Sequence, residues 1–198
     1  MTYKIGITGS IGSGKTTIAK CFSFFNIPVY DADLEVKHLL KEKLVIKQIK
    51  QKWPTTVSNN QLNKKKLKSI VFSNDIDKKF LENLLHPILK KRKERFEKEN
   101  KGKNILIFDV PLLYETNSEK NYSLVILANC DLDIQRERVL LRDKISSKLF
   151  YDILSKQMSV EEKLKFKPKL INTNKLRFLI YLEIIILLVQ IYIGFMRR

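Results

Sequence analysis

Cysteine and histidine are scarce in this chain of 198 residues, which has two of each. Cys21 and Cys130 stand far apart, without the short spacing of metal ligands, and two thiols cannot build the disulfide framework of a small secreted protein. We therefore exclude a disulfide scaffold and expect both cysteines to be reduced residues of the core.

A basic leader followed by a long apolar segment is missing from the first residues, which run directly into the alternating pattern of residues 3–8. A secretory signal peptide needs both features. We therefore expect a cytoplasmic protein, and the chain length fits one domain with insertions.

Acidic residues are few relative to basic ones, since 21 Asp and Glu stand against 38 Lys and Arg for a formal net charge of +17. Such a surface favours polyanions, namely nucleic acid, an anionic membrane or a phosphate-rich small molecule. The lysines are spread over the whole chain, however, and gather only at 63–66 and 90–93. Because neither interleaved aromatic residues nor a known module accompanies these clusters, we expect no nucleic-acid partner.

Glycine is also rare, with six in the chain, yet three of them lie in the single loop Gly9–Gly14. The loop continues into Lys15 and Thr16 to complete the pattern G-x-x-x-x-G-K-[ST], between a predicted strand at 3–8 and a helical pattern at 17–22. In such a loop the backbone N–H groups surround phosphates, the lysine neutralises their oxygens and the threonine hydroxyl can ligate Mg²⁺. We therefore predict ATP or GTP binding. The predicted nucleotide-binding residues are Gly9, Ser10, Ile11, Gly12, Ser13, Gly14, Lys15, Thr16 and Thr17.

Two apolar runs, 104–109 and 123–128, have the composition of parallel strands buried on both faces, and a shorter strand is predicted at 28–30. Strands separated by helical segments indicate a parallel sheet that binds ligands at the carboxyl ends of its strands. The predicted fold class is therefore α/β, with a P-loop NTPase-type parallel β-sheet core flanked by helices. The core is assigned to residues 1–33, 100–131 and 166–198.

Two helical segments interrupt this core. Residues 34–99 are mostly charged, with apolar residues at spacings of three and four, which is typical of amphipathic helices. We interpret them as a helical insertion rather than a separate domain. Residues 132–165 are a second charged, helical stretch in which no strand is predicted.

Acidic residues follow two of the predicted strands. Asp31 and Asp33 come after the strand at 28–30, where a carboxylate can accept the proton of an attacking hydroxyl or hold a Mg²⁺ water. Each is equally well explained as a cap of the helix that follows. Asp109 ends the strand at 104–109 in the position of a Walker-B carboxylate, although many strands end in aspartate.

Arg136, Arg138 and Arg142 lie on one predicted helix, where Arg138 and Arg142 are four residues apart and share a face. Arginines on a mobile lid can close over a transferring phosphoryl group. A solvated, salt-bridged helix face is the alternative, and the spacing alone favours it. His86, which precedes Pro87, has no nucleophile to activate and by itself is typical of a packed or capping residue.

In their order and spacing these motifs resemble those of the dephospho-CoA kinase family, P-loop kinases that phosphorylate the ribose 3′-hydroxyl of dephospho-CoA in the last step of coenzyme A synthesis. The resemblance covers about residues 3–166. It is carried by the loop with its strand (5–17), Val29-Tyr30-Asp31-Ala32-Asp33, Val71-Phe72 with Leu81-Glu82, His86-Pro87, Asp109-Val110-Pro111-Leu112-Leu113-Tyr114-Glu115, and Gln135 through Arg138 to Arg142-Asp143 with Gln157.

The resemblance implies ATP as phosphate donor, Mg²⁺ as cofactor and dephospho-CoA as acceptor. It makes 34–99 a helical acceptor-binding domain for dephospho-CoA and 132–165 a helical lid, and we expect a monomer. The implied catalytic residues are Asp33 as general base, Lys15 and Arg142. The implied substrate-binding residues are Asp31, Asp33, His86, Pro111, Leu112, Arg138 and Gln157, while Thr16 and Asp109 bind the metal and Asn172 lies near the adenine.

The resemblance ends at Phe166. The family continues there into a last strand that ends in asparagine and leads to an amphipathic helix. In this chain Pro168 precedes Asn172, and we expect the proline to weaken strand pairing. A frameshifted tail and a degenerating tail would both explain the departure.

The final segment, residues 178–196, carries one formal charge, Glu183, and its length approaches the thickness of a bilayer core. A membrane anchor and a helix packed on the sheet are the two alternatives. We favour the packed helix because Glu183 and Gln190 would both be costly in lipid.

Three hypotheses about function follow. The leading one is a dephospho-CoA kinase. A nucleoside or nucleoside-monophosphate kinase would keep the loop and change the acceptor. A membrane- or RNA-associated nucleotide-binding protein is motivated by the net charge and the apolar tail.

Overall fold

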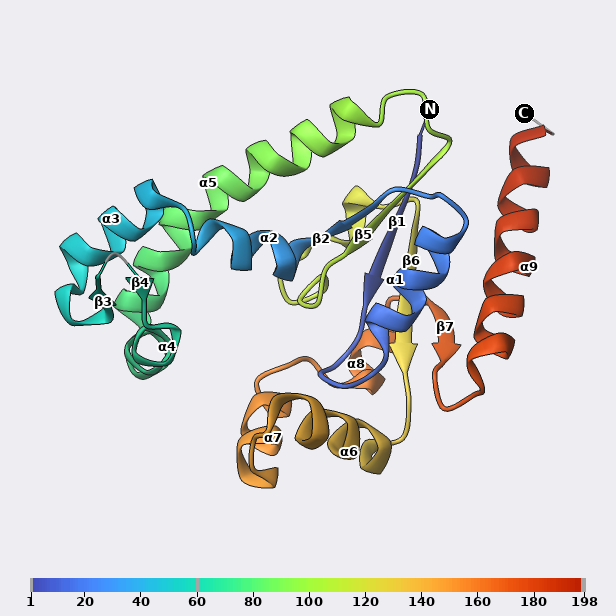
Figure 1. Cartoon of the computed structure of the whole chain (residues 1–198). Coiled ribbons are helices and arrows are strands. Elements are labelled where there is room, and N and C mark those ends of the chain that lie inside the picture. Colours follow the sequence, from blue (N-terminus) through green and yellow to red (C-terminus); the bar gives the residue numbers. More distant parts are fainter. Residues whose placement is uncertain (1, 60, 197–198) are drawn as a thin grey trace. The chain divides into compact units, whose positions relative to one another are not determined.

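The computed structural model describes residues 2–59 and 61–196. It divides the chain into two compact units, one formed by Met1–Tyr30 with Gly102–Arg198 and the other by Asp31–Lys101 (Figure 1). We call these unit 1 and unit 2. Unit 2 contains the whole of the predicted helical insertion at 34–99.

Unit 1 is built on a five-stranded sheet with the strand order β2-β5-β1-β6-β7. The strands are β1 (Tyr3–Thr8), β2 (Val29–Asp31), β5 (Ile105–Asp109), β6 (Leu124–Asn129) and β7 (Lys169–Asn172). The pairs β1–β5, β1–β6 and β6–β7 are all parallel. This topology confirms the predicted α/β class, and the strands predicted at 3–8, 28–30, 104–109 and 123–128 all form, with ends shifted by a residue.

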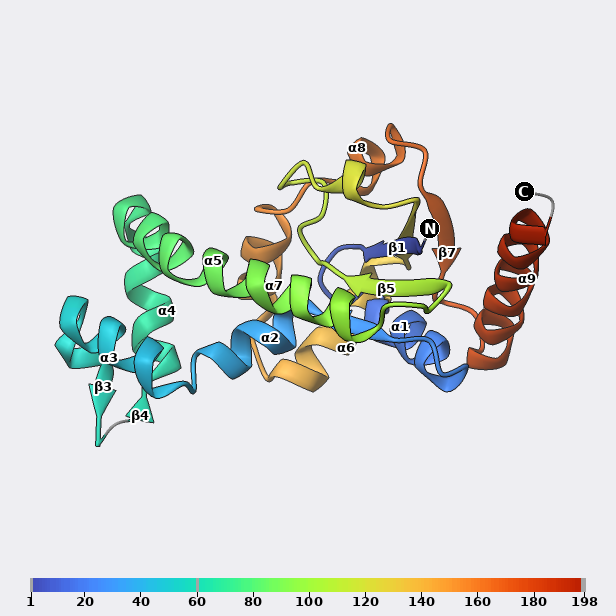
Figure 2. The same ribbon diagram turned by 90° about the horizontal axis from the view of Figure 1, so that it is seen from above.

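The central strands are buried because their side chains face packed layers on both sides. Ile5 and Ile7 of β1 and Ile107 of β5 have no exposed surface. Branched side chains of this kind suit the pleated surface of a strand. Helix α1 (Lys15–Phe24) and helix α9 (Arg177–Met196) contribute to the same apolar cluster as these strands. Figure 2 shows α1 and the short helix α8 (Val160–Leu164) on opposite sides of the sheet.

The segment predicted as helical between 132 and 165 contains three helices, α6 (Leu132–Asp143), α7 (Ser147–Leu154) and α8, and a short 3₁₀ turn precedes β6 at Glu119–Asn121. Helices α7 and α8 start at serine caps, Ser146 and Ser159, whose hydroxyls accept backbone N–H groups. The Glu162 carboxylate accepts a hydrogen bond from the Ser159 N–H, which completes a capping box.

Unit 2 is mostly helical and has its own apolar core. Its elements are α2 (Ala32–Leu39), α3 (Lys43–Lys52), a 3₁₀ turn (Pro54–Thr56), β3 (Val57–Ser58), β4 (Gln61–Leu62), α4 (Lys64–Ser73) and α5 (Asp75–Glu99). Its buried core residues are Leu39, Val45, Ile49, Trp53, Val57, Leu67 and Leu85. The small antiparallel hairpin β3–β4 was not predicted, because strands of two residues are too short to show an alternating pattern.

The expectation that Pro168 would weaken the last strand was wrong. Strand β7 begins at Lys169 and pairs in parallel with β6 from Ile126↔Lys169 to Asn129↔Asn172. Pro168 precedes the first paired residue, and β7 is an edge strand, so the missing proline N–H removes no hydrogen bond from the ladder.

The final segment forms α9, which packs on α1 and the sheet through one face, as expected. Within the described part of the chain, α9 is the one helix long and apolar enough to cross a membrane, over Arg177–Phe195, with a mean hydropathy of 2.3. Core helices of soluble proteins also meet that criterion, and 28% of this stretch is buried in the protein.

Candidate nucleotide-binding site

The glycine loop connects the end of β1 to the start of α1, as the sequence predicts. Gly12 and Gly14 have positive φ angles of 78° and 88°, which side chains disfavour. The space is closed as well, since a Cβ on Gly12 would lie 2.6 Å from the Gln135 carbonyl oxygen, and one on Gly14 2.6 Å from Thr173 Oγ1. These two positions therefore require glycine both for conformation and for room.

The loop is shaped as a receptor for an anion. Its turn is closed by a hydrogen bond of 3.1 Å from the Ser13 N–H to the Ser10 carbonyl. Helix α1 starts at Lys15 without a side-chain cap and without an acidic residue in its first turn, so its positive end is not neutralised from within α1. The Lys15 ammonium donates to the carbonyls of Gly9 at 2.7 Å and of Ser10 at 3.1 Å, which holds the cation over the loop.

The two predicted metal-binding residues suit magnesium. Thr16 is exposed in the first turn of α1, while Asp109 is buried at the carboxyl end of β5, in register with Ile7 of β1. Among residues 2–59 and 61–196, no group of three or more His, Cys, Asp or Glu side chains could hold a metal by itself. One hydroxyl and one carboxylate fit Mg²⁺, which takes few protein ligands and completes its shell with phosphate oxygens and water.

Gln157 contacts the loop directly. Its side-chain oxygen accepts a hydrogen bond of 2.9 Å from the Ile11 N–H. Gln157 lies between α7 and α8, so this contact joins the predicted lid to the middle of the glycine loop. The amide was predicted to bind substrate, and the contact with the loop backbone was not foreseen.

Arg138 and Thr173 brace the loop from behind. The Arg138 guanidinium donates to the Thr173 carbonyl at 2.9 Å and to its hydroxyl oxygen at 3.1 Å. The buried Thr173 hydroxyl in turn donates to the Ser13 carbonyl at 2.8 Å. The Cys130 thiol also lies here, 3.7 Å from the Gly12 carbonyl oxygen, and its burial raises its pKa. The arginine therefore supports the nucleotide loop through a threonine that sequence reasoning missed.

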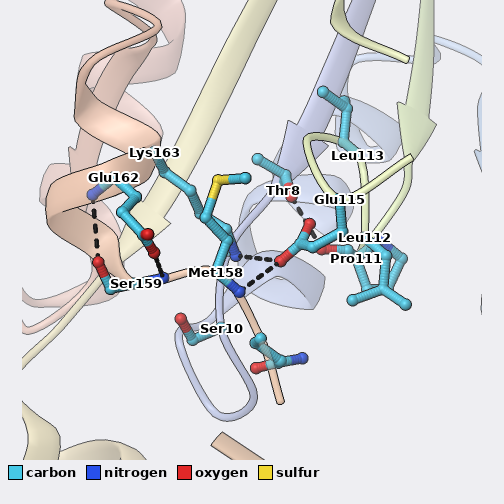
Figure 3. Close-up of polar contacts among 12 residues, drawn as sticks. Thr8, Ser10, Pro111, Leu112, Leu113, Glu115, Met158, Ser159, Glu162 and Lys163 are labelled. Atoms are coloured by element: carbon cyan, nitrogen blue, oxygen red, sulfur yellow. Dashed lines mark hydrogen bonds and ion pairs between the residues drawn. The ribbon is translucent and has the colours of Figure 1, made fainter. Parts of the chain in front are cut away.

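A buried ion pair contacts the residue that follows Gln157. The Lys163 ammonium has no exposed surface and is 3.0 Å from Glu115 Oε1, which also accepts the Met158 N–H at 3.0 Å. Figure 3 shows both nitrogens meeting one carboxylate oxygen. In the sequence, Glu115 is only the last residue of a motif, and nothing distinguishes Lys163 from the many other lysines. Because Glu115 also accepts the Met158 N–H, the ion pair helps to hold the backbone next to Gln157 in place.

The remaining residues predicted in unit 1 are placed as follows. Arg142 is exposed near the end of α6 and makes two hydrogen bonds of 2.8 Å to Asp143. The Pro111 carbonyl accepts the Thr8 hydroxyl at 2.9 Å, and Leu112 beside it is 44% exposed (Figure 3). Asn172 ends β7, where its side-chain oxygen accepts the Asn174 N–H at 2.8 Å.

Three predicted residues belong to unit 2. Asp31 caps α2, because its carboxylate accepts the Leu34 N–H at 2.8 Å. Asp33 is exposed in the first turn of the same helix. His86 is exposed on α5, one residue before the proline that interrupts the hydrogen bonding of that helix. The capping explanation thus holds for Asp31, and Asp33 follows it as an exposed residue of the same helical turn.

The comparison with protein families extends the resemblance beyond its expected end. A family model described as dephospho-CoA kinase matches residues 3–177. The expectation that the resemblance fails after Phe166 was therefore wrong, because the match includes the whole of β7. The match ends at residue 177, where α9 begins.

Curated relatives agree with this match. The dephospho-CoA kinase of Bartonella quintana is 35% identical over 173 residues, which are 86% of this chain and 89% of the relative. That of Rhodopseudomonas palustris is also 35% identical, over 86% of each protein.

Solved structures support the same fold. The crystal structure of TT1252 from Thermus thermophilus is similar with a TM-score of 0.85 and 28% identity, over 96% of each chain. Dephospho-CoA kinase from Campylobacter jejuni has a TM-score of 0.65 and 23% identity over 96% of this chain, a likeness of fold. From the family model, the relatives and the glycine loop together, this chain is a member of the dephospho-CoA kinase family.

Proposed function

We propose that this protein transfers the γ-phosphate of ATP to the ribose 3′-hydroxyl of dephospho-CoA, with Mg²⁺ as cofactor. The observation that carries the proposal is the glycine loop between β1 and α1, complete with Lys15 and an uncapped helix terminus, in a chain that matches the family over most of its length. We also propose that the protein is cytoplasmic and monomeric.

The donor side of the reaction uses unit 1. Backbone N–H groups of the loop and the start of α1 hold the phosphates, and Lys15 leaves the carbonyls of Gly9 and Ser10 to neutralise the β- and γ-phosphate oxygens. Thr16 and Asp109 would hold the magnesium ion, which would neutralise charge that develops on the phosphate oxygens. Asn172 at the end of β7 lines the adenine site.

The acceptor side uses Asp33 as general base toward the 3′-hydroxyl. The exposed position of Asp33 in the first turn of α2 supports this assignment. Unit 2 binds dephospho-CoA, with Asp31 and His86 among its contacts. Pro111 and Leu112 of unit 1 complete the acceptor contacts.

Residues 132–165 act as a lid over the transferring phosphate. Gln157 already contacts the loop through Ile11, which links movement of this segment to the phosphate site. Arg138 borders the site through Thr173, and Arg142 exchanges its exposed contact with Asp143 for the phosphoryl group when the lid closes. Substitution of Arg142 by lysine would test this role, because lysine keeps the charge and loses the two-point contact.

The acceptor is tested by measuring ADP release from ATP with a panel of acceptors. We expect release to depend on dephospho-CoA and to be at background with adenosine, AMP and CoA itself, whose 3′ position is already phosphorylated. Release that is faster with adenosine or AMP would establish the nucleoside or nucleotide kinase alternative and contradict the proposal.

The general base is tested with Asp33→Asn. Removal of a general base lowers rate by about 10²- to 10⁴-fold, and the loop in unit 1 should still bind ATP. The matched control is Asp75→Asn, which makes the same change at another exposed position in the first turn of a unit 2 helix. Equal turnover of the two variants would remove Asp33 from the reaction.

A further inference from the structure

Helix α9 has two apolar faces, and only one of them is covered. The inner face contributes Ile180, Ile184, Leu187, Leu188 and Ile191 to the core of unit 1. At about 100° of rotation per residue, the exposed apolar side chains occupy the opposite arc of roughly 140°. They are Phe178, Leu179, Leu182, Ile185, Ile186, Val189, Tyr192 and Ile193. We call this set the outer face. Figures 1 and 2 place α9 at the margin of unit 1, beside α1 and β7.

The outer face contains no polar side chain apart from the tyrosine hydroxyl. Phe178 is 63% exposed, and both Ile186 and Val189 are 51% exposed. Glu183 and Gln190, which follow Arg177 in the helix, lie along the border between the faces, and Glu183 pairs with Lys175 at 3.2 Å. A contiguous apolar surface along a helix of about 30 Å indicates a binding surface.

The inner face excludes a membrane-spanning role for the folded protein. Ile184 is fully buried and Ile180 is 1% exposed, so α9 could cross a bilayer only by leaving the core of unit 1. The outer face can meet an apolar environment without any such change, because the helix axis would lie parallel to the surface that it contacts.

Net charge favours a lipid surface over a second copy of the chain as the partner of the outer face. Two copies that each carry a formal net charge of +17 repel one another, whereas an anionic bilayer attracts the protein. Exposed Lys175 and Arg177 lie directly before the outer face in the sequence. Basic residues near an anionic surface strengthen the attraction.

We propose that the outer face of α9 docks the protein on the surface of an anionic phospholipid membrane, while the inner face stays packed in unit 1. The apolar side chains enter the headgroup boundary to a depth of about 5–10 Å, and Lys175 and Arg177 meet the phosphates. Docking is reversible and needs no change in the nucleotide site.

The proposal is tested by flotation of the purified full-length protein with vesicles of phosphatidylcholine containing one third phosphatidylglycerol. We expect binding to these vesicles, little binding to pure phosphatidylcholine, and release at high salt. Ile186→Glu with Val189→Glu should lower the partition coefficient more than tenfold, because two apolar side chains of the outer face are replaced by charged ones that resist burial in the headgroup boundary. The matched control, Leu44→Glu with Ile76→Glu, changes two exposed apolar residues of unit 2 to the same charge.

Circular dichroism and vesicle-free kinase activity show whether the outer-face variant is folded. If the double glutamate variant is not, Ile186→Ser with Val189→Ser removes the apolar surface without new charge. Equal partition of the outer-face and control variants would overturn the proposal, as would binding that ignores anionic lipid. A dimer in analytical ultracentrifugation that the outer-face variant abolishes, without vesicle binding, would assign the face to a second copy. Resistance to alkaline carbonate extraction would show an integral segment and would also overturn it.

Discussion

The ion pair between Lys163 and Glu115 predicts an unequal response to removal of either partner. Lys163 has no exposed surface, whereas the Glu115 side chain is 18% exposed and keeps the Met158 N–H as a second donor. Removal of one partner of a buried pair costs about 3–5 kcal/mol, since the other charge is left without compensation. Glu115→Gln strands the fully buried ammonium and should cost about 4 kcal/mol. Lys163→Met leaves a carboxylate with some water and one donor, so we expect about 2–3 kcal/mol.

Urea unfolding of the three variants measures these costs. In the double variant Lys163→Met with Glu115→Gln no charge is buried, and the glutamine oxygen can still accept the Met158 N–H. The double variant should therefore be more stable than Glu115→Gln alone. The matched control is the exposed pair Arg95–Glu99, whose loss should change the stability far less than Glu115→Gln does.

The same variants connect stability with the nucleotide site. Met158 follows Gln157, which holds the Ile11 N–H of the loop. At a temperature where every variant remains folded, we expect Glu115→Gln to raise the KM for ATP more than the Arg95 control does. Single costs that simply add in the double variant, or a cost below about 1 kcal/mol for Glu115→Gln, would refute the reasoning.

Three further predictions concern the loop and the core beside it. Gly12→Ala should lower ATP affinity and cost about 1–2 kcal/mol of stability, because its φ is 78° and its Cβ space is closed, whereas Gly194→Ala in α9 meets open space and should be neutral or stabilising in the same thermal unfolding assay. Burial raises the pKa of Tyr114 to about 12, so the folded protein favours the neutral phenol. The stability that this preference contributes is present below pH 10 and is lost as pH rises through 12. Tyr114→Phe should therefore reduce the fall in denaturant midpoint between about pH 9 and 12. Arg138→Lys cannot hold both the carbonyl and the hydroxyl of Thr173, and an ATP titration should show weaker binding with an intact fold; unchanged affinity would make the brace irrelevant to the loop.

The sequence by itself determined the parts of the protein that consecutive residues build. The glycine loop, Lys15 and the strand before them form one continuous stretch, so their pattern states the geometry directly. The buried strands were equally legible, because strands covered on both faces are apolar throughout. The order of motifs then named the family, and the comparisons confirmed it.

Only the tertiary structure decided the features that depend on residues far apart in the chain. Thr173 and Arg138 meet behind the loop, and Glu115 pairs with Lys163, through side chains that look ordinary in the sequence. No local pattern records such a meeting, because ion pairing and bracing are set by packing.

Helix α9 shows the same difference between what the sequence and the structure decide. The sequence showed that residues 178–196 are apolar, and it left a packed helix and a membrane segment as alternatives. A helix that is apolar all round has no periodicity from which the covered face can be deduced. The structure decides which face is buried, because the sheet and α1 can contact one side of α9 and leave the other exposed.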